Sequence, residues 1–179
     1  PQKNIDILEN LQRLLPKVCA ILDMHMNDMH QCDFSYLTLK AIEELRSEKF
    51  TKTNQYGMEL KHILIDEFQD TSMLQTILIE SLIMLWDDTK QRSLFIVGDP
   101  MQSIYKFRQA DVRLFKRIQN EGIGHLKLDS LALTSNFRSS YLLINHFNET
   151  FSAIFPKNDD LPLGGITYHP STSINKIDG

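Results

Sequence analysis

The stretch His62–Thr71 reads HILIDEFQDT and places two adjacent carboxylates directly after a short, largely apolar run. The run 62–65 is typical of a parallel strand buried in a sheet. In open α/β sheets, ligands bind outside the carboxyl ends of the strands, which is where Asp66 and Glu67 would lie. A nucleotide-hydrolysing site needs one carboxylate for Mg²⁺ and another for the attacking water. A strand that ends in an ordinary acidic turn would show the same residues.

A second stretch, Leu94–Arg108, reads LFIVGDPMQSIYKFR and repeats the layout of a strand followed by a polar loop. Gly98 permits a tight exit from the strand, and Asp99 and Gln102 supply short polar side chains at its tip. We therefore expect this loop to lie beside Asp66 at one edge of a parallel sheet.

The end of this loop interleaves two aromatic residues with two cations, as Tyr105, Lys106, Phe107 and Arg108. Such a pattern suits an unstacked nucleic-acid strand, because every base offers a π-face and every phosphate a negative charge. The same residues would equally serve as core aromatics next to a solvated charged surface.

A third stretch, Leu131–Ser140, reads LALTSNFRSS and predicts a strand that runs into a polar turn and a helix cap. Arg138 in this turn could be an ordinary surface arginine. If it pointed at a phosphate, its guanidinium would neutralise charge that develops on the transferred group.

Together these stretches resemble motifs II, III and IV of the UvrD/Rep-type superfamily 1 helicases, in the order that the family has them. The matching segments are DEFQD at 66–70, GDPMQSIY at 98–105 and NFRS at 136–139. Upstream, DFSYL at 33–37 is similar to the segment that precedes motif II in this family.

The resemblance implies a role for each matching residue. Asp66 would coordinate Mg²⁺, Glu67 would activate water, and Gln102 would sense the γ-phosphate of ATP. Arg138 would contact the same phosphate from the hinge between two RecA-like domains. The path of single-stranded DNA would run over Tyr105, Phe107 and Arg108.

Departures from the UvrD/Rep pattern indicate a branch of the family. Phe107 replaces a tryptophan and is followed by the pair Ala110-Asp111, which is similar to helicase-nuclease subunits of the AddA/RecB type. Gln109 stands where glycine is usual, and Pro100-Met101 lies inside the loop, so the backbone path of the loop is not given by the resemblance.

No phosphate-binding loop of the form G-x-x-x-x-G-K-[ST] occurs among the 179 residues. We therefore expect this chain to be an excised piece of a longer protein and to be inactive alone as an ATP hydrolase. The resemblance implies that the full-length protein is an ATP-dependent DNA helicase, 3′ to 5′ in direction, in DNA repair or recombination. Its expected partners are single- and double-stranded DNA, ATP, the remaining domains of the same chain and a second subunit of a helicase-nuclease complex.

Composition is consistent with a cytoplasmic machine that has no membrane partner. Hydrophobic residues make up 42% of the chain, enough for one core, and no run approaches the length of a membrane span. Two cysteines are too few for a disulfide framework. The net charge of −4 is unfavourable for a free-standing DNA binder but compatible with one wall of a groove that other domains complete.

The sequence predicts an α/β fold: a partial RecA-like (P-loop NTPase) parallel sheet with flanking helices, preceded by a helical segment. The expected divisions are a helical segment at 1–60, a motor core at 61–138, and the start of a second motor domain at 139–179. Hydrophobic spacing and caps predict helices at 5–29, with a break or kink near Pro16, and at 35–49, 72–86, 111–119 and 140–155. Strands are predicted at 62–65, 94–97, 126–133 and 166–168.

Two alternatives remain at this point. The cluster of Met, His and Cys side chains at 24–32 could bind copper or zinc, although His25 and His30 are five residues apart and do not stack on one helix face. The parent protein could also be a non-translocating DNA-binding or regulatory protein that retains the sheet without ATPase function. The presence together of Asp66, Glu67, Gln102 and Arg138 favours the enzyme.

Overall fold

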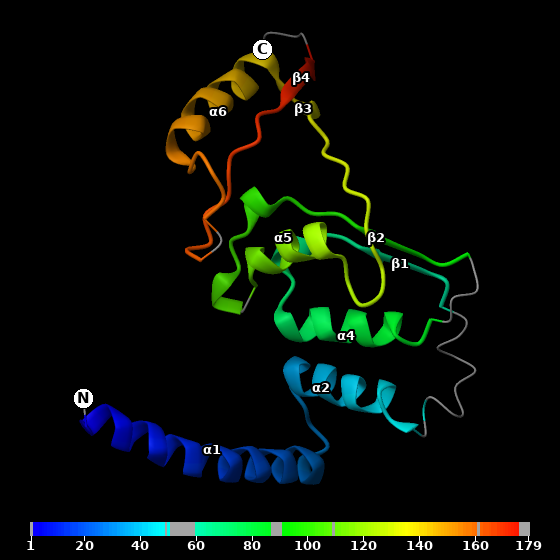
Figure 1. The fold of residues 1–179 in the computed structure, drawn as a ribbon, viewed down its shortest axis with the longest axis vertical. Coiled ribbons are helices and arrows are strands. Elements are labelled where there is room, and N and C mark those ends of the chain that lie inside the picture. Colours follow the sequence, from blue (N-terminus) through cyan, green and yellow to red (C-terminus); the bar gives the residue numbers. More distant parts are fainter. Residues whose placement is uncertain are drawn as a thin grey trace.

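The computed structural model describes residues 2–48, 50, 60–86, 91–108, 110–160 and 162–175, with only the backbone at residues 2–4, 108 and 175. Its helices and strands alternate along the chain (Figure 1). In order they are α1 (Gln2–Met29), α2 (Phe34–Leu45), β1 (His62–Ile65), η1 (Phe68–Asp70), α4 (Met73–Ile83), β2 (Ser93–Ile96), η2 (Pro100–Gln102), η3 (Lys106–Arg108), α5 (Val112–Glu121), β3 (Ser135–Ser140), α6 (Tyr141–Ile154) and β4 (Thr172–Asn175).

Strands β1 and β2 pair in parallel, as the sequence predicts, with His62 opposite Ser93 and Ile65 opposite Ile96. Parallel strands need a crossover connection, and α4 provides most of it. Helix α4 begins at the predicted place because Ser72 caps it with a capping box: its side chain accepts the Gln75 N–H, and the Gln75 side chain accepts the Ser72 N–H. The two strands therefore end at the same edge of the sheet.

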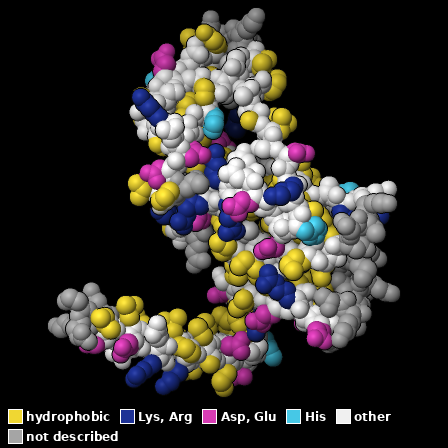
Figure 2. Space-filling view, in the orientation of Figure 1, with side chains coloured by type: hydrophobic (Ala, Val, Ile, Leu, Met, Phe, Trp, Pro, Cys, Tyr) yellow, Lys and Arg dark blue, Asp and Glu magenta, His cyan; other side chains and the backbone are white. Residues whose placement is uncertain are grey.

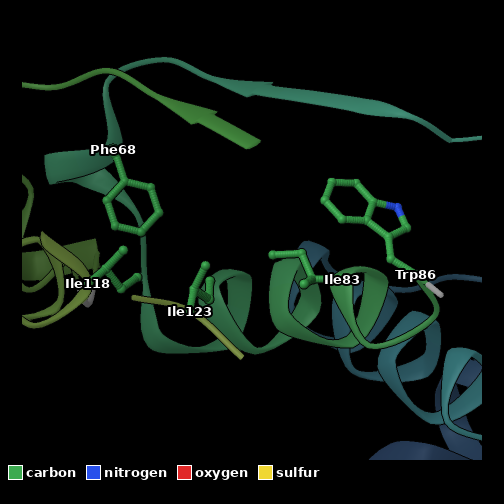
Figure 3. Close-up of a cluster of buried hydrophobic side chains, with 5 residues drawn as sticks. All are labelled: Phe68, Ile83, Trp86, Ile118 and Ile123. Atoms are coloured by element: carbon green, nitrogen blue, oxygen red, sulfur yellow. The ribbon is translucent and has the colours of Figure 1, made fainter. Parts of the chain in front are cut away.

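A hydrophobic cluster fills the space between this sheet and the helices (Figure 3). Phe68 enters it directly after β1, and its ring lies 6.0 Å from that of Phe115 on α5. Because α5 and η1 share this contact, the turn that carries the acidic residues is tied to the core. The buried members of the cluster are Phe68, Ile83, Trp86, Ile118 and Ile123.

Only one face of the β1–β2 sheet is covered in the part of the chain that the structure describes. Ile63 and Ile65 face the cluster, whereas Leu64 is 74% exposed and Phe95 is 61% exposed. The sequence-based expectation of a fully buried strand is therefore wrong for these residues. Parallel sheets normally carry helices on both faces, so the open face is one that further structure would cover.

Helix α1 is one continuous helix through Pro16, without the predicted break, and it stands apart from the sheet (Figure 1). Its apolar side chains, including Leu8, Val18 and Leu22, are exposed and form much of the yellow surface on the lower helix in Figure 2. The apolar spacing thus identified the helix correctly but not a packed core.

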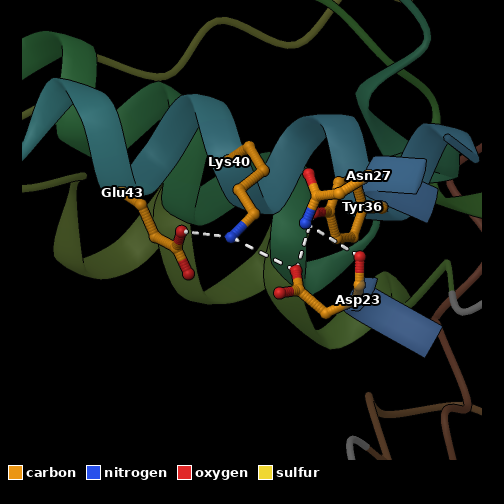
Figure 4. A network of polar contacts seen from close by, with 5 residues as sticks. All are labelled: Asp23, Asn27, Tyr36, Lys40 and Glu43. Carbon is orange, nitrogen blue, oxygen red and sulfur yellow. Dashed lines mark hydrogen bonds and ion pairs between the residues drawn. The ribbon is translucent and has the colours of Figure 1, made fainter. Parts of the chain in front are cut away.

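A polar network joins the end of α1 to α2 (Figure 4). The Tyr36 hydroxyl donates to Asp23 Oδ1 at 2.7 Å, and Lys40 Nζ lies 3.5 Å from the same oxygen. The hydrogen bond from Tyr36 and then the charge of Lys40 lower the pKa of the Asp23 carboxyl. Helix α2 is capped by Asp33, whose side chain accepts the Tyr36 N–H, and not by Ser35 as predicted. It ends at Leu45, short of the predicted residue 49, which itself lies outside the described residues.

The last part of the chain forms a second, separate pair of parallel strands packed with α6. The predicted strands at 126–133 and 166–168 are wrong: the strands are β3 and β4, with Ser135 opposite Thr172 and Asn136 opposite Ser173. Backbone groups form a strand only where a partner strand is in reach, and the partner of β3 lies more than thirty residues further along the chain. The predicted cap of α6 is confirmed, since Ser140 Oγ accepts the Leu143 N–H at 3.5 Å.

The segment between α6 and β4 returns to the first sheet and contacts the loop that follows β2. Lys116 on α5 pairs with Asp159 at 3.1 Å, and the His169 N–H donates to the Met101 sulfur at 3.3 Å. Burial, and secondly the charge of Asp99, raises the pKa of the Tyr168 hydroxyl. The two parts of the chain therefore meet beside the edge where β1 and β2 end.

Each helix in the described part of the chain is too short or too polar to cross a membrane.

Candidate functional site

The edge where β1 and β2 end brings together two of the three stretches singled out in the sequence. The Val97 N–H donates to the Ile65 carbonyl at 2.8 Å, and the Phe68 N–H donates back to the Val97 carbonyl at 3.0 Å. These bonds continue the pairing beyond the strands, so that Asp66 and Glu67 leave the sheet beside Gly98 and Asp99.

Glu67 adopts a left-handed backbone conformation, with φ 52° and ψ 42°. Such a conformation costs a residue other than glycine about 1–3 kcal/mol and persists only where the surroundings enforce it. Here the Glu67 N–H donates to Asp66 Oδ1 at 2.9 Å, and the Glu67 carbonyl accepts the Asp70 N–H at 3.0 Å. The turn thus holds both carboxylates at the sheet edge, where both residues are exposed.

Gln69 connects the two strand ends and was assigned no role from the sequence. Its side chain is buried, its Nε2 donates to Glu67 Oε2 at 2.6 Å, and its Oε1 accepts the Asp99 N–H at 3.0 Å. The sequence gives no sign of this role, because Asp99 lies 30 residues from Gln69 along the chain.

Asp99 organises the loop that carries Gln102. Its Oδ1 accepts the Met101 N–H at 2.9 Å, which caps η2, and its Oδ2 accepts the Gln102 Nε2–H at 2.7 Å. Gly98 is required just before it, since a Cβ there would lie 2.6 Å from Gln69 Oε1 and 3.0 Å from the backbone nitrogen of Phe68.

The aromatic residues predicted to contact DNA follow on the same loop. The rings of Tyr105 and Phe107 lie 5.8 Å apart and are tilted by 55°. Phe107 is 77% exposed, so the alternative of a core aromatic is wrong for this residue, whereas Tyr105 is half-buried. The side chain of Arg108 lies outside the described residues.

Arg138 is not brought to this edge. It lies on β3, which Figure 1 places near α6 and away from β1 and β2. Asn136 Oδ1 accepts the N–H groups of Arg138 and Ser139, at 3.0 and 2.8 Å. Among the described residues, no hydrogen bond or ion pair joins the Arg138 side chain to Asp66, Glu67 or Gln102.

The donor set at this edge fits a metal ion that arrives together with phosphate. Mg²⁺ in nucleotide sites takes one or two carboxylates and completes its shell with water and phosphate oxygens. Asp66 is exposed and oriented by the Glu67 N–H, whereas both Asp99 oxygens already accept bonds within their loop. Within the described ranges, including residues 24–32, no three His, Cys, Asp or Glu side chains are placed to hold a metal by themselves.

Comparison with known proteins identifies relatives of this chain. A family model described as UvrD/REP helicase N-terminal domain matches residues 1–122. The chain is 33% identical over 153 residues to the AddA subunit of the ATP-dependent helicase/nuclease of Latilactobacillus sakei, covering 84% of this chain and 16% of the relative. It is 28% identical to the protein of the same name from Staphylococcus saprophyticus (94% and 15%), and 34% identical to that from Lactobacillus acidophilus (79% and 11%). The chain thus spans about a sixth or less of the length of these relatives.

Proposed function

Because this chain belongs to the UvrD/REP helicase N-terminal domain family, we propose that it forms part of the motor of an ATP-dependent DNA helicase of the helicase/nuclease type. The proposed reaction of the full-length polypeptide is ATP hydrolysis that drives movement on DNA in the 3′ to 5′ direction. The observation that carries the proposal is the shared edge of β1 and β2, where Asp66, Glu67 and the Gln102 loop meet.

At this edge Asp66 is the proposed ligand of Mg²⁺ and Glu67 the proposed base for the attacking water. Bound Mg²⁺ would neutralise charge on the β- and γ-phosphates. Glu67 is suited to accept a proton because it stands at the strand tip with its carboxylate directed by Gln69. Gln102 is proposed to sense the γ-phosphate, and its present bond to Asp99 is one that a phosphate oxygen could replace.

Arg138 is proposed to reach the γ-phosphate when two RecA-like domains close on the nucleotide. Its place on β3, apart from the carboxylates, supports a residue that arrives by domain closure and not one that is permanently in the site. The division into a helical segment at 1–60, a motor core at 61–138 and the beginning of a second motor domain at 139–179 belongs to the same proposal. The separate β3–β4 pair supports the last boundary.

Other segments of the same polypeptide are proposed to complete the motor. The exposed Leu64 and Phe95 lie on the open face of the β1–β2 sheet, and a RecA-like sheet carries helices on both faces. A phosphate-binding loop must come from one of these segments, as must much of the positive charge for DNA. A second subunit of a helicase-nuclease complex and a role in DNA repair or recombination are proposed from the names of the relatives.

We expect this chain alone to bind Mg-ATP weakly and not to hydrolyse it, whereas the full-length polypeptide should do both and unwind duplexes with a 3′ single-stranded tail. Without a phosphate-binding loop, the β- and γ-phosphates lose their backbone cradle and lysine. Calorimetric titration of the chain with Mg-ATP, and unwinding assays of the polypeptide on 3′- and 5′-tailed duplexes, measure the two expectations. Micromolar affinity of the chain for Mg-ATP, or unwinding restricted to 5′-tailed duplexes, would contradict the proposal.

The DNA path is proposed to run over Tyr105 and Phe107, with Arg108 on a phosphate. Phe107→Ala in the full-length polypeptide should weaken single-stranded DNA binding by about 1–3 kcal/mol, the usual contribution of a base stacked on an aromatic ring. Its ring is already exposed, so the melting temperature should change little. Fluorescence titration with a labelled oligonucleotide gives the affinity, and Phe137→Ala, which removes another exposed ring from β3, is the matched control. A lower melting temperature with unchanged affinity of the folded protein would instead assign Phe107 to packing.

A further inference from the structure

Gln69 is a buried polar residue whose amide is used at both ends by residues from different strands. Its side chain lies in η1 and the residue is 2% exposed. The amide nitrogen donates to Glu67 Oε2 at 2.6 Å, and the amide oxygen accepts the Asp99 N–H at 3.0 Å. The orientation of the amide follows from its partners, because a flipped amide would place its oxygen against a carboxylate oxygen and its NH₂ against an N–H.

The contacts of Gln69 continue to Gln102. The backbone carbonyl of Gln69 accepts the Ser103 hydroxyl at 3.1 Å, directly after Gln102 in the chain. Asp99, whose N–H donates to Gln69, accepts the side-chain amide of Gln102 at 2.7 Å. An unbroken series of hydrogen bonds therefore leads from Glu67 through Gln69 and Asp99 to Gln102.

The surroundings of Gln69 leave its side chain little room to move. The α-carbon of Gly98 lies so close that an added Cβ would come within 2.6 Å of Gln69 Oε1. Phe68, the neighbour of Gln69 in η1, is fixed in the hydrophobic cluster. A side chain held in this way can fix the direction of the flexible glutamate beside it.

We propose that Gln69 is a positioning residue that holds the Glu67 carboxylate at the strand tip and ties it to the loop that carries Gln102. This inference rests on the proposed function, in which Glu67 activates the attacking water. A glutamate side chain in solution samples several rotamers, and a displacement of about 1 Å in a reacting group can cost on the order of 10²-fold in rate. Gln69 itself contacts neither nucleotide nor water in this scheme and acts through Glu67.

The test is Gln69→Met in the full-length polypeptide, because methionine has a similar length and volume but makes neither hydrogen bond. With saturating ATP and single-stranded DNA, kcat should fall by roughly 10- to 100-fold, while KM for ATP should stay within about threefold, since ground-state binding does not need the aligned carboxylate. Turnover is expressed per ATP-binding site, counted by equilibrium titration, so that partial unfolding does not imitate the effect. Gln75→Met is the matched control: it removes only the capping box of α4, and its kcat should be unchanged.

Gln69→Glu separates positioning from packing. The glutamate keeps the shape and the acceptor for the Asp99 N–H, but it places an oxygen where Nε2 now donates to Glu67. Positioning requires a loss of kcat at least as large as that of Gln69→Met. Activity of Gln69→Glu close to that of the unsubstituted protein would overturn the inference, because shape and the Asp99 bond would then suffice.

A double variant distinguishes failure of this inference from failure of the proposed function. If Gln69 acts through Glu67, adding Gln69→Met to Glu67→Gln should lower kcat no further. If Glu67→Gln alone is inactive and Gln69→Met has normal kcat, the positioning role is rejected and the proposed function stands. If Glu67→Gln itself keeps normal turnover, the proposed function fails and the positioning role with it.

Discussion

Replacing Glu67 by glutamine in the full-length polypeptide should slow DNA-stimulated ATP hydrolysis by about 10²- to 10⁴-fold, the usual contribution of a general base. The amide retains the size of the side chain and one acceptor oxygen, but it cannot take up a proton. Binding of Mg-ATP should change little, because the interaction that is lost forms only in the transition state. Steady-state turnover, together with equilibrium binding of a fluorescent ATP analogue, measures the two quantities separately.

Two further variants define what this result means. Asp66→Ala should weaken Mg-ATP binding itself, because it removes the proposed metal ligand and with it the charge balance at the phosphates. Glu44→Gln makes the same chemical change at an exposed position on α2 and should leave turnover unchanged. Normal DNA-stimulated hydrolysis by Glu67→Gln would favour the alternative of a non-translocating DNA-binding or regulatory protein that retains this sheet.

Replacing Phe68 by alanine should lower the free energy of unfolding by about 3–5 kcal/mol, the usual cost of removing a buried phenyl ring. Phe68 is 1% exposed and packs in the cluster between the sheet, α4 and α5. Natural domains are stable by only about 5–15 kcal/mol, so much of the total would be lost. Chemical denaturation followed by circular dichroism gives the difference in free energy between variant and unsubstituted chain.

Phe34 provides the matched control for this measurement. It is also a phenylalanine within a motif-like segment, but it is 90% exposed at the start of α2. Phe34→Ala should change the free energy of unfolding by no more than about 0.5 kcal/mol. Equal effects of the two substitutions would show that the cluster around Phe68 does not stabilise the fold.

The sequence by itself determined the features whose causes are local. The apolar run before Asp66 predicted β1, and the Ser72 capping box and the Ser140 cap predicted where α4 and α6 begin. In each case the deciding hydrogen bond or side-chain alternation lies within a few residues of the position concerned. The motif residues also identified the family, and the match over residues 1–122 confirms it.

Features that depend on distant partners were decided only by the tertiary structure. The strand at Ser135–Ser140 exists because Thr172–Asn175 pairs with it, whereas the apolar alternation at 126–133 predicted a strand in the wrong place. Gln69 acquires its two bonds only when β1 and β2 pair, which brings the Asp99 N–H to its amide oxygen. The physical reason is the same in both cases: a hydrogen bond needs both partners within about 3 Å, and the chain's folding, not its local pattern, brings residues 30 or more positions apart to that distance.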